Sequence, residues 1–531
     1  MGSGRVPLST VLAVIAWTCL CAALTTWAME SPTPASWTFC VSAPFLWITG
    51  LRSAALWLRA RRAVTHARAA AATAPLTSPQ LRVALLYCVA DDADTAAIAA
   101  SARQDTSVDV VVLDDSHDER VTRRISDAAA ERGWTVVRRS HRRGYKAGNL
   151  NHGLAAVRGR HDAYVLCDSD VVLPPDFVRR TLPGLADPEV AVVQAQPVAR
   201  RGDTWFAQYF GPLLRTHLLV TRAGREASGV VALLGRGALV RAAALEDVGG
   251  VPEVVAEDLA LTVALRRRGW RLVNVDVEFH EDYPVDYRSF RTQMRKTAEG
   301  AVEFLRQARG LRGLRMRERV ELLLETSLIP VTAIAGLSCL VSGAALASLG
   351  SPPPVWALAT AAASALAPLA AEAARRVRRQ RLAAGVAFLA VGGVLYTSTM
   401  FVVLASVVRT AAGDRAVFRI TPKSSAPTGI RQAVELLRPE LVVAPVVMLL
   451  TALAAGSPVF AAAPLGPVAA ALAFTAPVLI ARRPVIRRRP AERSAHVLRS
   501  SLSRPSRPAP ARDSAHRPPH REARMEGVLQ T

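Results

Sequence analysis

Lysine is almost absent from this strongly basic chain. The 531 residues carry 66 Lys and Arg against 43 Asp and Glu, yet the only lysines are Lys146, Lys296 and Lys423. A guanidinium is a planar fork that is always charged, whereas an ammonium is a compact charge on a flexible stem. Because the chain uses arginine wherever any cation will do, the surroundings of each lysine are of interest.

Paired cysteine motifs are also missing. The six cysteines lie in apolar runs or predicted strands, and none forms a Cys-x-x-Cys pair or a zinc-ligand spacing. This argues against a disulfide scaffold and a zinc site. The sequence predicts buried thiols that act as small hydrophobic side chains.

The charge and the hydropathy together favour a membrane protein. Hydrophobic residues make up 51% of the chain and the mean hydropathy is +0.21, although the formal net charge is +23. Apolar spans raise the hydropathy of a membrane protein while Arg and Lys collect in its cytoplasmic loops. Nucleic-acid binding is disfavoured, because the arginine clusters flank apolar segments rather than one compact domain.

Two apolar segments open the chain, at residues 7–29 and 37–58, and each is about long enough to cross a bilayer. A cleaved signal peptide is the alternative for the first, but its apolar run is long and a second follows at once. Arginines after the second segment predict that the following domain is cytosolic.

Five further apolar segments follow residue 320, at residues 328–349, 355–371, 382–407, 441–455 and 464–480. The basic stretches between and after these segments should all be cytosolic. Four membrane crossings place all of them on the cytosolic side, whereas five crossings do not. We therefore expect residues 382–407 to lie along the interface or to enter the membrane and return, although the number of crossings stays open.

The segments divide the chain into five regions. Residues 81–315 alternate strand-like and helix-like runs, which predicts an α/β domain with a largely parallel sheet and helices on both faces. The other regions are two N-terminal transmembrane helices at 1–62, a linker at 63–80, transmembrane or interfacial helices at 316–481 with a cytosolic loop at 409–439, and a disordered basic tail at 482–531.

Three acidic pairs follow strands or open a helix of the α/β domain: Asp114–Asp115, Asp168-Ser-Asp170 and Glu257–Asp258. Each has a structural alternative in a turn or a helix N-terminus. In an open α/β sheet, however, ligands bind beyond the carboxyl ends of the strands. An Asp-x-Asp pair can hold a hard divalent cation, which could neutralise a diphosphate, and a further carboxylate could act as general base.

Eight ordered elements carry a family resemblance: LDDS at 113–116, GYKAGNLN at 144–151, DSD at 168–170, VQ at 193–194, GRGA at 235–238, GGVPEVVAED at 249–258, QMRKT at 293–297 and FRITPK at 418–423. Their order resembles the membrane-embedded family 2 glycosyltransferases of the cellulose-synthase, chitin-synthase and poly-N-acetylglucosamine-synthase type. The resemblance covers about residues 80–310 and touches 410–425. All three lysines fall inside these elements.

The resemblance implies a GT-A-like domain on the cytosolic face of the plasma membrane. It implies that Asp115 contacts the uracil or ribose, with Asp114 beside it in a more structural role. Asp168 and Asp170 would bind Mg²⁺ or Mn²⁺, and Asp258 would be the catalytic base. The other implied substrate-binding residues are Lys146, Gly237, Glu257, Gln293, Lys296 and Lys423. The implied partners are a nucleotide sugar, a saccharide or lipid acceptor and membrane lipids, without nucleic acid.

One departure from the family pattern leaves the product open. The family's Gln-x-x-Arg-Trp element reads Gln293-x-x-Lys296-Thr297 here, and threonine cannot stack on a sugar ring. We expect inverting transfer, with UDP-glucose or UDP-N-acetylglucosamine as donor, to a growing polysaccharide. Single-sugar transfer to a lipid or lipid-linked acceptor is the alternative, and a catalytically silent partner of an exopolysaccharide assembly is a second.

Overall fold

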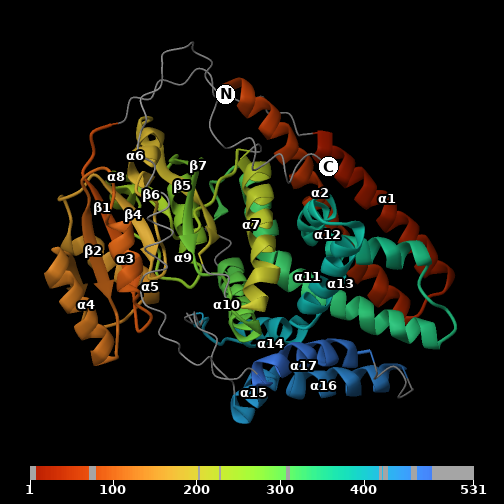
Figure 1. Cartoon of the computed structure of the whole chain (residues 1–531). Helices are drawn as coiled ribbons and strands as arrows, with labels where there is room; N and C mark the ends of the chain where they lie inside the picture. Colours follow the sequence, from red (N-terminus) through yellow and green to blue (C-terminus); the bar gives the residue numbers. More distant parts are fainter. Residues whose placement is uncertain are drawn as a thin grey trace.

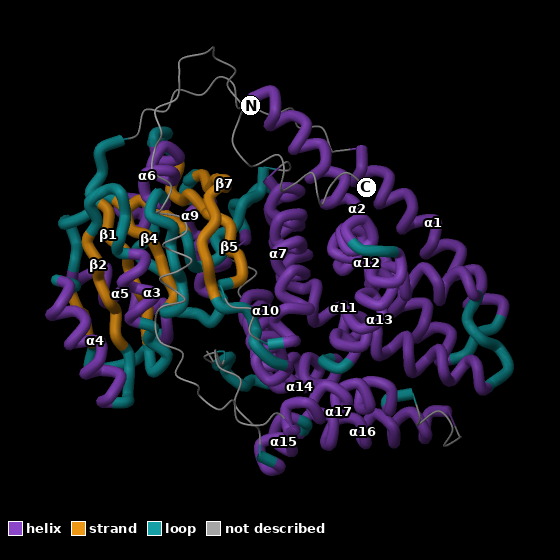
Figure 2. Tube along the Cα trace, viewed as in Figure 1, coloured by secondary structure: helices purple, strands orange, loops and turns teal. Residues whose placement is uncertain are grey.

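The computed structural model describes residues 8–70, 79–200, 204–226, 229–306, 311–417, 421, 429–455 and 463–480. The α/β domain lies on one side and a bundle of long helices on the other, and α7 (Trp205–Glu226) and α10 (Tyr287–Arg306) lie between them (Figures 1 and 2). The predicted tail at 482–531 lies outside the described residues.

The described residues of the α/β domain form a seven-stranded sheet with strand order β3-β2-β1-β4-β6-β5-β7. Four of its six strand pairings are parallel, and β6 runs antiparallel to both of its neighbours. The predicted, largely parallel sheet is therefore confirmed. The strands are β1 (Val83–Val89), β2 (Asp109–Asp114), β3 (Thr135–Arg138), β4 (Ala163–Asp168), β5 (Val190–Ala199), β6 (Ala238–Arg241) and β7 (Arg271–Glu281).

Both faces of the sheet are covered. Successive side chains of a strand point to opposite faces, so Leu85 and Tyr87 of β1 join one core cluster while Leu86 joins another. The first face is packed by α3 (Thr95–Ser101), α4 (Glu119–Arg132) and α6 (Phe177–Thr181), and the second by α5 (Tyr145–Ala156), α8 (Ala242–Asp247) and α9 (Glu257–Arg267). Burial on both sides explains why β1 reads as a continuous apolar run.

Long apolar helices make up the second part of the molecule. Among the described residues, five helices are long and apolar enough to cross a membrane: Thr10–Glu30, Pro34–Arg61, Met316–Ser348, Val355–Arg379 and Leu382–Ala411. The helices are α1 (Leu8–Glu30), α2 (Pro34–Ala70), α11 (Met316–Ser348), α12 (Val355–Arg379), α13 (Leu382–Thr397), α14 (Met400–Ala411), α15 (Ile430–Leu436), α16 (Arg438–Ala455) and α17 (Leu465–Ile480). The predicted fold class, an α/β domain joined to apolar helices, is confirmed.

The structure adds two details to the sequence-based expectation. Helix α2 continues to Ala70, so the linker expected from residue 63 begins no earlier than residue 71. The reason is composition, because the alanine- and arginine-rich residues 59–70 favour helix. The segment predicted to lie along the interface or to enter and return is a helix interrupted at Ser398 and Thr399, between α13 and α14. The number of crossings stays a prediction.

Helices α7 (Trp205–Glu226) and α10 (Tyr287–Arg306) connect the two parts (Figure 1). Arg291 of α10 forms a bidentate ion pair with Glu440 of α16, with both N–O distances at 2.8 Å. The same guanidinium donates to the backbone oxygens of Ser398 and Leu436. Both charged side chains are at most 2% exposed. This pair joins α10 to α16, and removing one partner would leave an uncompensated buried charge.

Candidate active site

The predicted acidic residues meet because of the sheet register. Strands β1, β2 and β4 are parallel neighbours, with Val89 opposite Asp114 and Cys88 opposite Asp168. The carboxyl ends of the three strands therefore lie at one edge of the sheet, with β1 in the middle. Asp115 follows β2 directly and lies at the same edge.

Lys146 is at the centre of this edge. Its Nζ lies 2.6 Å from Oδ1 of Asp168 and 3.5 Å from Oε1 of Glu257, and it donates to the backbone oxygen of Gly235 at 3.0 Å. One ammonium thus joins three sequence elements. Burial alone would lower the pKa of Lys146, but Asp168 and Glu257 outweigh it and raise the pKa above its ordinary value. The lysine is therefore fully charged at neutral pH.

Glu257 and Lys296 belong to the same electrostatic cluster. Burial raises the pKa of Glu257, Lys146 opposes this, and the neighbouring charge of Asp258 adds to the rise. Burial lowers the pKa of Lys296, while the charge of Glu257 partly restores it. Helix α10 thus brings Lys296 to the strand ends. The thiol of Cys88 lies among these groups, and burial is the main cause that raises its pKa to about 12.

Asp258 is half-buried at the first turn of α9, where the helix macrodipole favours an anion. Its Oδ1 accepts from the backbone N–H of Leu259 at 2.8 Å. Gly235 lies against it, since a Cβ at that glycine would be 3.2 Å from the Cβ of Asp258. A larger residue at position 235 would therefore crowd Asp258 and lie close to the carboxylate of Glu257.

The two aspartates at the end of β2 have arginine partners. Asp114 is buried and accepts from Nε of Arg138 at 2.8 Å and from the N–H of Ser116 at 2.9 Å. Asp115 accepts from Nε and Nη2 of Arg139 at 2.9 and 2.6 Å. Both arginines escaped the sequence reasoning. The signal was their place at the end of β3, which Arg138 closes and Arg139 follows, because that end lies beside the end of β2.

Asp168 and Asp170 are the predicted metal ligands. Oδ2 of Asp170 accepts from the N–H of Asp282 at 2.9 Å, and Asp168 is paired with Lys146. Among the residues that the structure describes, no group of three or more His, Cys, Asp or Glu is arranged to hold a metal ion. Mg²⁺ is commonly bound by one or two carboxylates, with phosphates and waters as its other ligands. The two aspartates therefore fit a cation whose shell a diphosphate completes.

Arg236 is a further cation that the sequence reasoning missed. It pairs with the buried Glu281, whose Oε1 accepts from Nη2 at 2.8 Å. Burial alone would lower the pKa of Arg236, but Glu281, and to a smaller extent Asp168 and Asp170, raise it. The edge of the sheet thus carries fixed positive charge from several elements, as binding of a diphosphate requires.

The remaining predicted substrate-binding residues are Gly237, Gln293 and Lys423. Gly237 has a φ of +58°, and a Cβ there would overlap the ring of Phe279, so packing accounts for this glycine. Gln293 lies on α10 one turn before Lys296, and its Oε1 is buried with no hydrogen-bond partner among the described residues. Lys423 lies outside the described residues.

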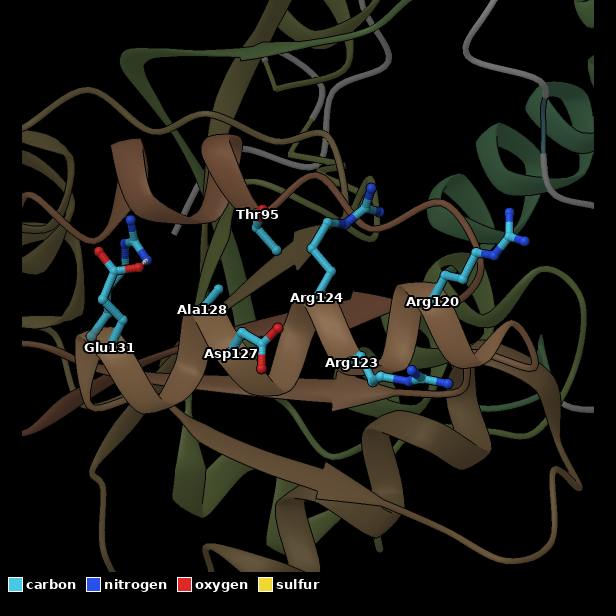
Figure 3. A pocket seen from close by; sticks show the side chains of 8 residues that line it. Thr95, Arg120, Arg123, Arg124, Asp127, Ala128 and Glu131 are labelled. Atoms are coloured by element: carbon cyan, nitrogen blue, oxygen red, sulfur yellow. Dashed lines mark hydrogen bonds and ion pairs between the residues drawn. The ribbon is translucent and has the colours of Figure 1, made fainter.

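A hollow of about 530 Å³ lies elsewhere, on the outer face of α4. Figure 3 shows that Arg120, Arg123 and Arg124 extend from this helix in different directions. None of the residues that line the hollow belongs to the acidic edge of the sheet. We therefore assign the candidate active site to the strand ends and not to this hollow.

Comparisons with known proteins point to glycosyltransferases. A family model described as "Glycosyl transferase family group 2" matches residues 164–412. Two Arabidopsis thaliana proteins, probable glucomannan 4-beta-mannosyltransferase 15 and glucomannan 4-beta-mannosyltransferase 2, are 29% and 30% identical over 209 residues, which is 37% of this chain and 39% of each relative. The chain thus matches about two fifths of the length of these relatives.

Among solved structures, the mannosyltransferase PcManGT from Pyrobaculum calidifontis, in complex with GDP-Man and Mn²⁺, is 20% identical with a TM-score of 0.49. The similarity covers 70% of this chain and 99% of that one.

Proposed function

Because this chain belongs to the family 2 glycosyltransferases, we propose that it transfers a hexosyl group from a nucleotide sugar to an acceptor hydroxyl at the membrane surface. The observation that carries the proposal is the position of Lys146, which joins Asp168, Glu257 and Gly235 at the carboxyl edge of the sheet. This GT-A-like arrangement gathers both the carboxylates and the cations that a nucleoside-diphosphate donor needs.

Asp168 and Asp170 would hold Mg²⁺ or Mn²⁺, and the ion would supply positive charge to offset the negative charge that develops on the leaving diphosphate. Lys146, Lys296 and Arg236 add positive charge that is fixed before the donor arrives, which lowers the reorganisation needed during the reaction. Asp115, oriented by Arg139, contacts the ribose or base.

Asp258 is the general base. Its carboxylate takes the proton of the acceptor hydroxyl while the acceptor oxygen bonds to the anomeric carbon, and the bond from that carbon to the diphosphate oxygen breaks. The nucleoside diphosphate leaves on the opposite face, so an α-linked donor gives a β-glycoside. Glu257 differs in role, because its carboxylate pairs with Lys146.

Glucose or N-acetylglucosamine carried by UDP is the first proposed donor, from the family resemblance. Mannose is a second candidate, because the curated relatives named above are mannosyltransferases. The proposed product is a membrane-associated polysaccharide, with single-sugar transfer to a lipid acceptor as the alternative. The arginines at the end of α2 support a cytosolic position of the domain at the plasma membrane.

The test is nucleoside-diphosphate release by the purified full chain, over a panel of UDP- and GDP-sugars with Mn²⁺, Mg²⁺ or EDTA. We expect metal-dependent release with one donor and a loss of about a hundredfold or more in Asp258→Asn, the range of general-base catalysis. Asp127→Asn, at an exposed position on α4, is the matched control and should retain activity.

Product analysis separates the two acceptor classes. A ladder of chain lengths indicates polymer synthesis, and a single lipid-soluble glycoside indicates one transfer. If no donor is consumed even with a membrane extract that supplies acceptors, the chain is instead a catalytically silent partner.

A further inference from the structure

The loop between β1 and α3, at residues 90–94, carries three aspartates. Oδ2 of one of them, Asp92, accepts a hydrogen bond from the hydroxyl of Ser169 at 2.7 Å. Ser169 stands between Asp168 and Asp170, the carboxylates to which the proposed function assigns the cation. We propose that Asp92 is a positioning residue, which orients this pair for a divalent cation by holding Ser169. This inference rests on the proposed function.

The two metal-binding aspartates lie in one tight turn. The N–H of Val171 donates to the backbone oxygen of Asp168 at 3.1 Å, which places Ser169 and Asp170 at the centre of the turn. The side chain of Ser169 points into the protein, since the residue is only 1% exposed. Its hydrogen bond to Asp92 therefore ties the middle of the turn to the loop that follows β1.

Asp92 is itself fixed within its own loop. Its Oδ1 accepts from the N–H of Ala90 at 3.1 Å, and Ala90 follows β1 directly. Strands β1 and β4 are parallel neighbours, with Cys88 opposite Asp168. One oxygen of Asp92 thus binds the end of β1, and the other binds the turn at the end of β4.

A second aspartate of the loop supports the same turn. Nη1 of Arg200 donates to Oδ2 of Asp94 at 2.8 Å and to the backbone oxygen of Asp170 at 3.3 Å. Asp94 is held in turn as the N-cap of α3, where its Oδ1 accepts from the N–H of Ala97 at 3.1 Å. The loop therefore contacts the metal turn through a side chain and, by way of Arg200, through the backbone.

Such outer contacts belong to the function of a metal site. Residues that hydrogen-bond around the ligands orient them, and removal of one such partner commonly weakens metal binding by about 10–100-fold. Mg²⁺ requires near-ideal octahedral geometry, so the direction of each carboxylate matters. Loss of the Asp92 acceptor should therefore weaken metal binding, which a purely structural contact does not predict.

The test measures Mn²⁺ binding directly, from the EPR signal of free Mn²⁺ over the purified full chain with UDP or GDP and without any sugar. We expect Asp92→Ala to raise the apparent Kd for Mn²⁺ about tenfold or more. Asp92→Asn keeps an acceptor oxygen and should recover most of that affinity.

Ser169→Ala removes the other partner of the hydrogen bond. It should weaken Mn²⁺ binding by a similar factor, and it provides the same test if Asp92→Ala folds poorly. The double variant should lose no more affinity than either single variant, because all three lack the same hydrogen bond.

Asp162→Ala is the matched control. The Oδ2 of Asp162, just before β4, accepts from the N–H of Arg82, just before β1, at 2.8 Å. Asp162 thus links the same two strands at their starts, at the opposite edge of the sheet. We expect this variant to keep the wild-type affinity for Mn²⁺.

The outcomes separate this inference from the proposed function. If the wild type and Asp92→Ala bind Mn²⁺ equally well, Asp92 is only structural and the inference is wrong, while the proposed function stands. Equal weakening in Asp92→Ala and Asp162→Ala indicates a general loss of stability and also overturns the inference. If the wild type binds no Mn²⁺ with either nucleotide, the proposed metal site is wrong, and the positioning role falls with it.

Discussion

Replacing Lys146 by methionine tests the electrostatics of the candidate site. The substitution keeps most of the apolar side chain but removes the cation that Asp168 and Glu257 share. The Lys146 and Glu257 side chains are about one-tenth exposed, and that of Asp168 one-third. Breaking a buried ion pair lowers the free energy of unfolding by about 3–5 kcal/mol. Because Asp168 is partly exposed, we expect a loss near the lower end of this range. For a domain of this size, about 3 kcal/mol corresponds to a fall in Tm of roughly 6–12 °C.

The stability that Lys146→Met loses should depend on pH in a defined direction. The raised pKa of Lys146 means that its charge stabilises the native state at every pH below the ordinary ammonium range. The wild-type lysine therefore does not titrate between pH 5 and pH 8. In the variant, burial and Asp258 still raise the pKa of Glu257, Lys146 no longer lowers it, and Lys296 remains to oppose them. Protonation of Glu257 removes its charge. The loss of stability in Lys146→Met is therefore full above the pKa of Glu257, and it becomes smaller as the pH falls through that pKa.

The assay is thermal unfolding of the detergent-purified chain at pH 8 and pH 5. We expect the larger fall in Tm at pH 8 and a partial recovery in Lys146→Arg, which keeps the charge. Arg267→Met, at an exposed position, should leave the Tm almost unchanged at both values. An equal loss for Lys146→Met at both pH values would refute the assignment of Glu257 as the uncompensated group.

Two further substitutions test how the site is supported. Gly237→Ala should lower the free energy of unfolding by about 2–4 kcal/mol, because the new Cβ meets the ring of Phe279 and the φ is positive. Gly159→Ala is the control, since it has open space around it and should lose only about 1 kcal/mol through backbone strain. The Tm values of the two variants, measured side by side, give the comparison. Arg291→Met should lower the free energy of unfolding by about 3–5 kcal/mol, because it leaves Glu440 buried and unpaired. In a double-mutant cycle on Tm, the double variant with Glu440→Met should recover much of that stability.

The sequence predicts the elements whose signals are local. Strand β1 is a continuous apolar run, α5 begins directly after Gly144, and Asp168 closes the apolar run of β4. Each of these features lies within a few consecutive residues. The sheet edge then follows from the rule that ligands bind at the carboxyl ends of parallel strands.

The partners of these residues could not be predicted in the same way. Arg139 reaches Asp115 only because β2 and β3 are neighbours, and Arg236 reaches Glu281 through the antiparallel insertion of β6. Both contacts depend on tertiary register, which no local pattern encodes. Charged side chains are common on surfaces, so an arginine in the sequence does not reveal that it is buried against a carboxylate.

Helix α10 gives the two parts of the molecule a common support. Lys296 belongs to the electrostatic cluster of Glu257 and Asp258, and Arg291, less than two turns earlier, is fixed to Glu440 of α16. Arg291 also binds the backbone oxygen of Ser398, at the interruption between α13 and α14. Because packed helices move as rigid elements, a shift of α16 or of this interruption would move α10, and with it Lys296 relative to Asp258. Lys296 is therefore positioned by the contacts of α10 with α16 and with the interruption between α13 and α14, as well as by the sheet.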